Sequence, residues 1–284
     1  MPTDRPVSRR ALPAAVSTLV AAVLQGERVA ATVLAAHRYA LYLSVRGSVL
    51  PVVTSDAVAL PTAVRLAAPA GAVSWGVGVG DEVLVGGGRI ALPGFDVVAA
   101  RTWRPSRVRH VVAAGGRSDD RRGSHLTTHL EMSGAGEESG WLADGIRQAL
   151  STHREAGAAV AGLVGRGAGL TPSGDDALAG ALLVAHALGA GEPLAAAVRA
   201  RLGATTAVSA ALLDAAADGY AARPVVTLVD GAVAGDPGAA RRALPAVLAI
   251  GHTSGADTVT GIRAALDTFL AETARTTSTG RSAA

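Results

Sequence analysis

The residues of this chain with the clearest chemical potential occur in one short pattern that is written twice. Residues 173–180 and residues 254–261 both read Ser-Gly-x-Asp-x-x-x-Gly. Because the Ser, the Asp and the last Gly are spaced by three and four residues, they share one face of a helix. A polar helix start that carries glycine offers free backbone N–H groups and the positive end of a helix dipole. The two copies therefore predict a site for one anionic ligand, such as a phosphate or a carboxylate.

A glycine-containing approach precedes each copy. Before the first copy, alternate glycines from Gly165 permit positive φ and let a ligand come close to the backbone. Before the second, His252 takes the place of Thr171, as a general acid–base group, a hydrogen-bond donor, or a capping or core histidine. The candidate ligand-binding residues of both copies are Gly167, Gly169, Thr171, Ser173, Gly174, Thr253, Ser254 and Gly255.

The candidate catalytic residues are His252 and three aspartates, Asp175, Asp176 and Asp257. Carboxylates beside an anion repel it unless Mg²⁺ or an N–H group of the substrate lies between them, so the aspartates are the expected ligands if Mg²⁺ is used. No other cofactor is implied. The structural alternative is that aspartates in a first turn stabilise the helix dipole by about 0.3–1 kcal/mol. That alternative explains a single Asp in the first turn of a helix well. It explains less well why two Asp residues are adjacent and why the pattern occurs twice.

A third stretch is a weaker candidate for ligand binding. Thr205, Thr206 and Ser209 line one side of a predicted helix start. Their hydroxyls could bind the same ligand. The alternative is that they cap the helix and bond back to its backbone.

The composition excludes several reaction classes. The sequence has no Cys, no Lys and no Asn. A thiol nucleophile, a Cys-ligated zinc site, a Walker lysine and a pyridoxal-phosphate Schiff base are therefore impossible. An anion must be held by Arg, backbone N–H groups, hydroxyls or a metal. The net charge of +3 is too small to indicate nucleic-acid binding.

The N-terminal residues raise the question of export. Ser8-Arg9-Arg10 and the apolar stretch after it loosely resemble a twin-arginine signal, although no convincing cleavage site precedes Glu27. Leu12, Val16 and the apolar residues that follow fit one face of an amphipathic helix better. No segment has the length and apolarity of a membrane span. We expect a cytoplasmic protein that binds neither membrane nor nucleic acid.

The pattern along the chain predicts an α+β protein, with a β-rich part shaped as a barrel or sandwich followed by a mainly helical domain. Residues 225–229 could instead form a lone strand inside the helical domain. His125 and His129, with Glu131 nearby, could bind a metal on a helix, but a solvated loop fits their neighbours better. The expected parts are an N-terminal helix (1–25), the β-rich domain (26–112), a linker or mobile loop (113–140), the helical domain (141–273) and a disordered tail (274–284).

Three motifs together resemble one bacterial family. They are Gly-Leu-Thr-Pro-Ser-Gly-Asp-Asp at 169–176, Thr-Thr-x-Val-Ser at 205–209 and Ile-Gly-His-Thr-Ser-Gly-Ala-Asp at 250–257. The family, long known as a domain of unknown function, includes the AllH subunit of oxamate carbamoyltransferase from allantoin breakdown. The resemblance runs from about residue 25 to 271 and is strongest after 160. It implies reversible carbamoyl transfer between carbamoyl phosphate and an amide such as oxamate, giving oxalurate and phosphate, together with AllF-like and AllG-like subunits.

Two other functions fit the sequence. A non-catalytic scaffold or regulatory subunit would bind a small anion without turning it over, and the family's multi-subunit setting favours it. A Mg²⁺-dependent hydrolase of a phosphorylated or ADP-ribosyl substrate is indicated by the faint similarity of residues 254–261 to the Asp-Thr clusters of helical ADP-ribosylhydrolases. Turnover by the isolated chain, or metal-dependent hydrolysis, would separate these functions from carbamoyl transfer.

Overall fold

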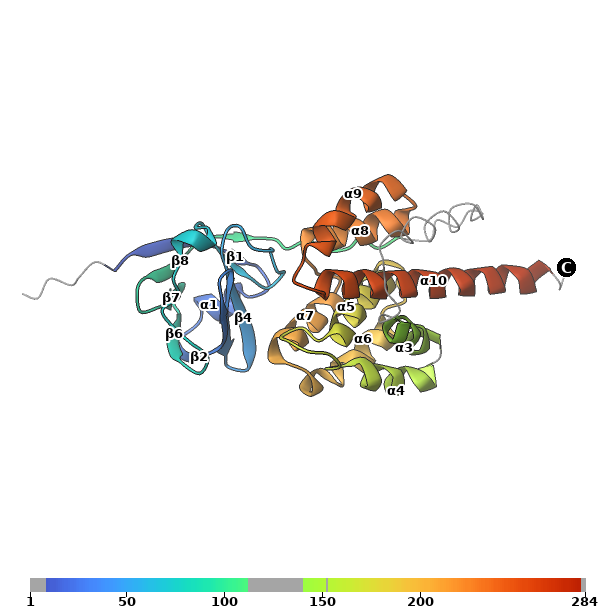
Figure 1. Ribbon diagram of the computed structural model, residues 1–284, viewed down its shortest axis with the longest axis horizontal. Helices are drawn as coiled ribbons and strands as arrows, with labels where there is room; N and C mark the ends of the chain where they lie inside the picture. The colour runs from blue at the N-terminus through green and yellow to red at the C-terminus, as the bar shows by residue number, and fades with distance from the viewer. Residues whose placement is uncertain (1–8, 112–139, 152, 282–284) are drawn as a thin grey trace, which may run out of the picture. The chain divides into compact units, whose positions relative to one another are not determined.

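A computed structural model of the protein describes residues 9–111, 140–151 and 153–281, and the chain divides into two compact units. The first unit ends at Pro105 and is built of strands, and the second begins at Ser106 and is built of helices. This is the α+β class that the sequence predicts, and the N-terminal part is a barrel. Figure 1 labels most of the elements of both units.

Eight strands close into a barrel in the first unit. Their order around it is β1-β5-β4-β3-β2-β6-β7-β8, and β8 returns to β1. The β1–β8 and β4–β5 pairs are parallel, and the other pairs are antiparallel. Closure pairs both edges of the sheet. The strands are β1 (Ala11–Ser17), β2 (Val29–His37), β3 (Ala40–Val45), β4 (Ser48–Val53), β5 (Val64–Leu66), β6 (Glu82–Gly86), β7 (Arg89–Ala91) and β8 (Asp96–Trp103).

Alternate side chains of β2 help to fill the barrel. Buried Ala31, Val33 and Ala35 alternate along β2 with more exposed residues, as a strand with one face on the core requires. Gly87 and Gly88 join β6 to β7, both with positive φ. Such a two-residue connection suits the twist of a hairpin, so these glycines form a turn.

The helix that the sequence predicts over residues 1–25 is wrong for residues 11–17. That segment forms β1, and the helical residues that follow are Ala21–Gln25 (α1). Buried Leu12 and Val16 are four residues apart, a spacing that fits one face of a helix and also one face of a strand. The hydrogen bonds that β1 exchanges with β5 and β8 decide in favour of the strand.

The second unit consists of helices packed around one core. The segment from Ser106 to Val111 also belongs to it, since the Val108 N–H donates to Gly219 O at 2.9 Å and the Val111 N–H to Ala187 O at 2.8 Å. None of the described helices is long and apolar enough to cross a membrane. The helices are α3 (Gly140–Ser151), α4 (His153–Leu163), α5 (Ser173–Ala187), α6 (Glu192–Arg199), α7 (Ala207–Ala217), α8 (Arg223–Ala234), α9 (Pro237–Leu248) and α10 (Ser254–Arg281).

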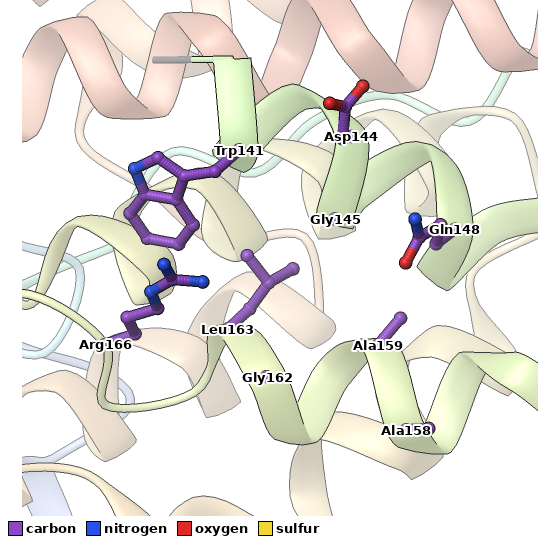
Figure 2. Close-up of a pocket in the computed structure, with 9 residues that line it drawn as sticks. All are labelled: Trp141, Asp144, Gly145, Gln148, Ala158, Ala159, Gly162, Leu163 and Arg166. Carbon is purple, nitrogen blue, oxygen red and sulfur yellow. The ribbon is translucent and has the colours of Figure 1, made fainter. Parts of the chain in front are cut away.

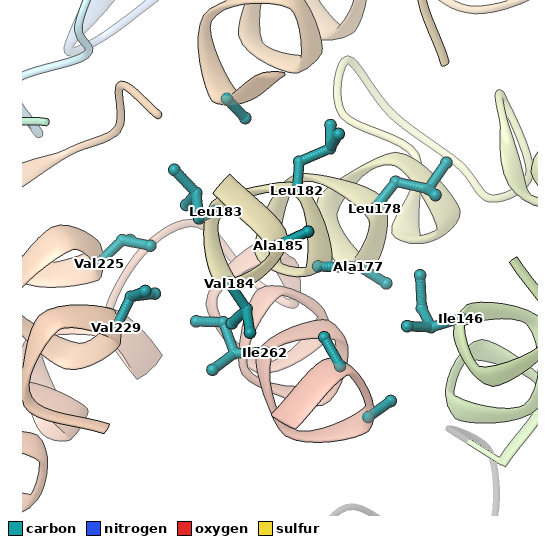
Figure 3. Packing of buried hydrophobic residues seen from close by; sticks show 14 of the residues in the cluster. Ile146, Ala177, Leu178, Leu182, Leu183, Val184, Ala185, Val225, Val229 and Ile262 are labelled. Carbon is teal, nitrogen blue, oxygen red and sulfur yellow. The ribbon is translucent and has the colours of Figure 1, made fainter. Parts of the chain in front are cut away.

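The central helix of this unit is α5. Its side chains are buried on nearly all sides, as expected of a helix that is apolar all round. In Figure 3, α5 has Val225 and Val229 of α8 on one side and Ile146 of α3 on the other, with Ile262 of α10 beside it. In Figure 1, α10 runs through the unit with α8 and α9 on one side and α3 and α4 on the other.

The helices α5 and α10 touch backbone to backbone. A Cβ placed on Gly180 would lie 2.3 Å from Thr258 O, and one on Gly261 would lie 1.9 Å from Ala177 O. Both distances are shorter than any real contact of a Cβ atom, so this crossing needs glycine on both helices. These glycines are the last residues of the two copies of the sequence pattern.

The structure differs from two further expectations of the sequence analysis, and a third lies outside the described residues. Residues 225–229 are helical and lie in α8, because Pro224 suits the first turn of a helix and Val225, Val226, Leu228 and Val229 bury one face. The tail expected to be disordered is helical as far as Arg281, since α10 continues through it. Residues 112–139, with His125, His129 and Glu131, lie outside the described part of the chain.

Candidate functional site

The two copies of the sequence pattern meet within the helical unit. Thr171, in the turn before α5, places its Oγ1 3.0 Å from Oγ of Ser254, the first residue of α10. The same two hydroxyls hydrogen-bond Asp176, and the charge of Asp257 acts on that carboxyl as well. We call Thr171, Asp176, Ser254 and Asp257 the α5–α10 cluster. The structure thus brings together four residues that the sequence singles out from two distant segments.

Each copy is built against the end of the helix before it. A Cβ on Gly174 would lie 2.0 Å from Leu163 O of α4, and one on Gly255 would lie 2.1 Å from Val247 O of α9. The Gly174 N–H donates to Arg166 O at 2.9 Å, and the Gly255 N–H donates to Ile250 O at 3.0 Å. The second glycine of each copy therefore permits close packing of helices, and its N–H already has an acceptor.

Other N–H groups at the two helix starts are also occupied. Those of Asp175 and Asp176 donate to Pro172 O at 2.9 and 3.1 Å, and that of Asp257 donates to Thr253 O at 2.9 Å. A helix start binds an anion through N–H groups that lack an acceptor. These groups are not free to do so, and an anion here would need other donors.

Asp175 connects the loop before α5 to the start of α7. It is 1% exposed, and both of its oxygens accept hydrogen bonds. Oδ1 accepts from the Gly165 N–H at 2.9 Å, and Oδ2 accepts from the Ser209 hydroxyl at 2.7 Å and from the Thr205 hydroxyl. Gly165 has a φ of +73°, and a Cβ there would lie 2.5 Å from Ala204 O. Asp175 thus acts as a positioning residue for the loop.

Thr206 strengthens the same connection. Its hydroxyl donates to Leu170 O at 2.5 Å and accepts from the Ser209 N–H at 3.0 Å, which makes it the N-cap of α7. Thr205, Thr206 and Ser209 all have partners inside the protein. Their geometry matches the capping alternative that the sequence leaves open for this stretch.

Asp176 and Asp257 each keep one oxygen without a partner. The Oδ2 atoms of both are buried and accept no hydrogen bond from any described residue. Burial raises the pKa of Asp176 to about 7, and the charges of Asp257 and Asp175 act in the same direction, against the hydrogen bonds from Ser254 and Thr171. Asp176 can therefore hold or release a proton near neutral pH, a property common among catalytic carboxyls.

Of the three aspartates expected to bind Mg²⁺ if it is used, two have an oxygen without a protein donor among the described residues. The described residues include no group of three or more His, Asp or Glu side chains that could hold a metal ion. Both oxygens of Asp175 already accept hydrogen bonds from donors of the protein. Two carboxylates remain, and Mg²⁺ held by them would take its other oxygen ligands from water or from the substrate.

The remaining candidates of the sequence lie in the loops before α5 and α10 or at the start of α5. Gly167, Gly169, His252 and Thr253 are exposed, and Ser173 at the start of α5 is half-buried. Gly167 has a φ of +127°, and a Cβ there would lie 2.5 Å from the Ser173 nitrogen. Gly167 therefore serves the tight turn of this loop.

Sequence reasoning missed a groove between α3 and α4. Its volume is about 660 Å³, and Figure 2 shows Trp141 and Arg166 at one end and Gln148 at the other. The Arg166 guanidinium carbon lies 4.1 Å from the centroid of the Trp141 ring, within reach of a cation–π interaction. Arg166 stands between Gly165 and Gly167, so its place in a glycine-rich loop was the available signal. The lining residues are Trp141, Asp144, Gly145, Gln148, Ala158, Ala159, Gly162, Leu163 and Arg166.

Comparison with known proteins identifies this region. Residues 163–266 match the family model described as oxamate carbamoyltransferase subunit AllH. The match begins at the last residue of α4 and contains the α5–α10 cluster and the start of α7. No solved structure matches the chain. Residues 163–266 of the helical unit, which contain all three motifs at 169–176, 205–209 and 250–257, are therefore similar to the AllH family.

Proposed function

We propose that this protein is a subunit of a carbamoyltransferase that moves a carbamoyl group between carbamoyl phosphate and an amide such as oxamate. The observation that carries the proposal is that the AllH match covers the residues whose side chains converge in the α5–α10 cluster. The name of the family model supplies the reaction. The cluster supplies polar groups that suit it, and the reaction needs no thiol, lysine or redox cofactor, in agreement with the composition.

In the direction of oxalurate formation, the amide nitrogen of oxamate attacks the carbonyl carbon of carbamoyl phosphate. A C–N bond forms, the C–O bond to phosphate breaks, and the nitrogen loses one proton. Asp176 is our candidate for the group that accepts this proton, because its pKa of about 7 lets it act as a base and return the proton in the reverse direction. The hydroxyls of Thr171 and Ser254 are our candidates for stabilising charge on the carbonyl oxygen.

Partner subunits form part of the proposal, since the family model describes a subunit. The occupied N–H groups of the helix starts are a second reason, because the phosphate needs donors from elsewhere. We propose AllF-like and AllG-like proteins as those partners, and a place for the complex in the nitrogen catabolism of purines and allantoin.

The test is a carbamoyl-transfer assay on the full chain, alone and with the proteins that co-purify with it, measuring oxalurate made from oxamate and carbamoyl phosphate. Because the base must be deprotonated, turnover should rise as the pH increases through about 7. Asp176→Asn should lower kcat by about 100-fold or more and remove that rise. Glu192→Gln, which neutralises an exposed carboxylate in the first turn of α6, is the matched control and should leave turnover unchanged.

The results separate the rival functions. Absence of oxalurate with every partner would contradict the proposal as a whole. Turnover that needs partners and is unchanged in Asp176→Asn would favour a non-catalytic subunit. Asp176→Asn must keep the far-UV circular dichroism of the wild type for its loss of turnover to count.

A further inference from the structure

We infer that the α5–α10 cluster binds the N–H₂ end of a primary amide or carbamoyl group through the unpartnered Oδ2 atoms of Asp176 and Asp257. The inference deepens the proposed function and rests on it for the choice of ligand. It also replaces the anion that the sequence pattern predicts at this place with an uncharged, planar group. The argument starts from the hydrogen-bond partners that the cluster lacks.

The two Oδ2 atoms need donors. Both are shielded from solvent, and Asp257 as a whole is only 7% exposed. A buried carboxylate oxygen without a donor is unfavourable, and buried polar groups in proteins are nearly always hydrogen-bonded. Asp175 shows how this fold satisfies a carboxylate when its role is structural, with three donors on its two oxygens. Asp176 and Asp257 each have one oxygen without such a donor. The geometry therefore points to donors that a ligand supplies.

An anion does not fit these oxygens. Asp175, Asp176 and Asp257 place three carboxyl groups close together, and the charges of the first and the third disfavour a charge on Asp176. The N–H groups of Gly174, Asp176 and Asp257 already have backbone acceptors. A phosphate or carboxylate ligand would therefore meet acceptors and repulsion at this position.

An amide group fits the complete set of polar atoms. Its planar N–H₂ carries two N–H bonds that point apart, one for each unpartnered oxygen. The hydroxyls of Thr171 and Ser254 lie 3.0 Å apart beside Asp176, and a hydroxyl can rotate, so one of them would turn its hydrogen from Asp176 to the carbonyl oxygen of the same amide. The charged end of the ligand would then lie away from the aspartates, towards the exposed Gly169 and His252.

Three ligands of similar shape test this inference by isothermal titration calorimetry on the full chain. Oxamate has the N–H₂ group, oxalate replaces it with a carboxylate, and N,N-dimethyloxamate keeps the amide without N–H. We expect oxamate to bind at least about tenfold more tightly than either of the others, because they leave the aspartates unpartnered. The preference should be the same with Mg²⁺ and with a chelator.

Variants provide a second measurement. Asp257→Asn introduces a donor where the wild type has an acceptor, so oxamate affinity should fall about tenfold and the preference over oxalate should narrow. The Glu192→Gln control should bind like the wild type. If Asp257→Asn does not fold, the ligand series on the wild type decides alone.

Equal binding of oxalate or dimethyloxamate, a requirement for Mg²⁺, or no binding of oxamate would each overturn the inference. The experiments distinguish a failure of this inference from a failure of the proposed function. Selective oxamate binding without oxalurate formation would support the amide site and contradict carbamoyl transfer. Oxalurate formation with unselective binding would support the transfer and contradict the amide site.

Discussion

The closest contact in the helical unit yields the sharpest prediction for stability. Replacing Gly261 with Ala would place a Cβ 1.9 Å from Ala177 O. An ordinary carbon–oxygen contact is roughly 3.3 Å, so α10 would have to retreat from α5 by roughly 1.4 Å. A gap of that size forfeits much of the dispersion energy along the interface. Overpacking of this kind costs about 1–3 kcal/mol or more, against a gain of about 1 kcal/mol in helix propensity.

We therefore expect Gly261→Ala to lower the free energy of unfolding by about 2 kcal/mol, measured by urea denaturation followed by far-UV circular dichroism. Gly157→Ala in α4 is the matched control, because a Cβ there meets nothing within 4 Å. It should raise the free energy of unfolding by about 0.5–1 kcal/mol. If Gly261→Ala were as stable as Gly157→Ala, the crossing of α5 and α10 described above would be wrong.

Two further predictions concern stability. The folded protein keeps Asp176 protonated up to about pH 7, whereas an unfolded chain releases this proton near pH 4. The stability contributed by this carboxyl is therefore complete below about pH 4 and is lost as the pH rises to about 7, and Asp176→Asn should remove that loss, on the order of 4 kcal/mol, in urea titrations across this range. Thr206→Ala should cost about 1 kcal/mol by removing the N-cap of α7, and thermal unfolding of Thr206→Ser, which keeps the hydroxyl, should show little change.

The elements of the fold that the sequence predicts well are those with a strong local signal. The turn at Gly87 and Gly88 follows from the positive φ that a tight hairpin needs, and α5 follows from Pro172 and the polar first turn after it. The strand β1 was missed because a four-residue spacing of apolar residues fits either period. Its partners β5 and β8 lie far along the chain, so no local signal could settle the choice.

The candidate site likewise has features that the sequence predicts and features that only the structure shows. Asp175 and Asp176 are neighbours in one first turn, and the sequence gives both the same expectation. The structure separates them, because Gly165, Thr205 and Ser209 supply donors to Asp175, whereas Asp176 faces the start of α10. The glycines that end the two copies are Gly180 and Gly261. They serve the contact between α5 and α10.

The sequence by itself determined that two polar helix starts with the same spacing exist, which chemistries are excluded, and which family motifs the chain carries. These properties depend on residue types and on local capping, so they can be read from neighbouring residues. Only the tertiary structure decided that the two starts meet, and which carboxylate oxygens have donors. Both depend on groups brought together from α4, α7, α9 and α10, because a hydrogen bond is satisfied by whatever lies nearby in space and not in sequence.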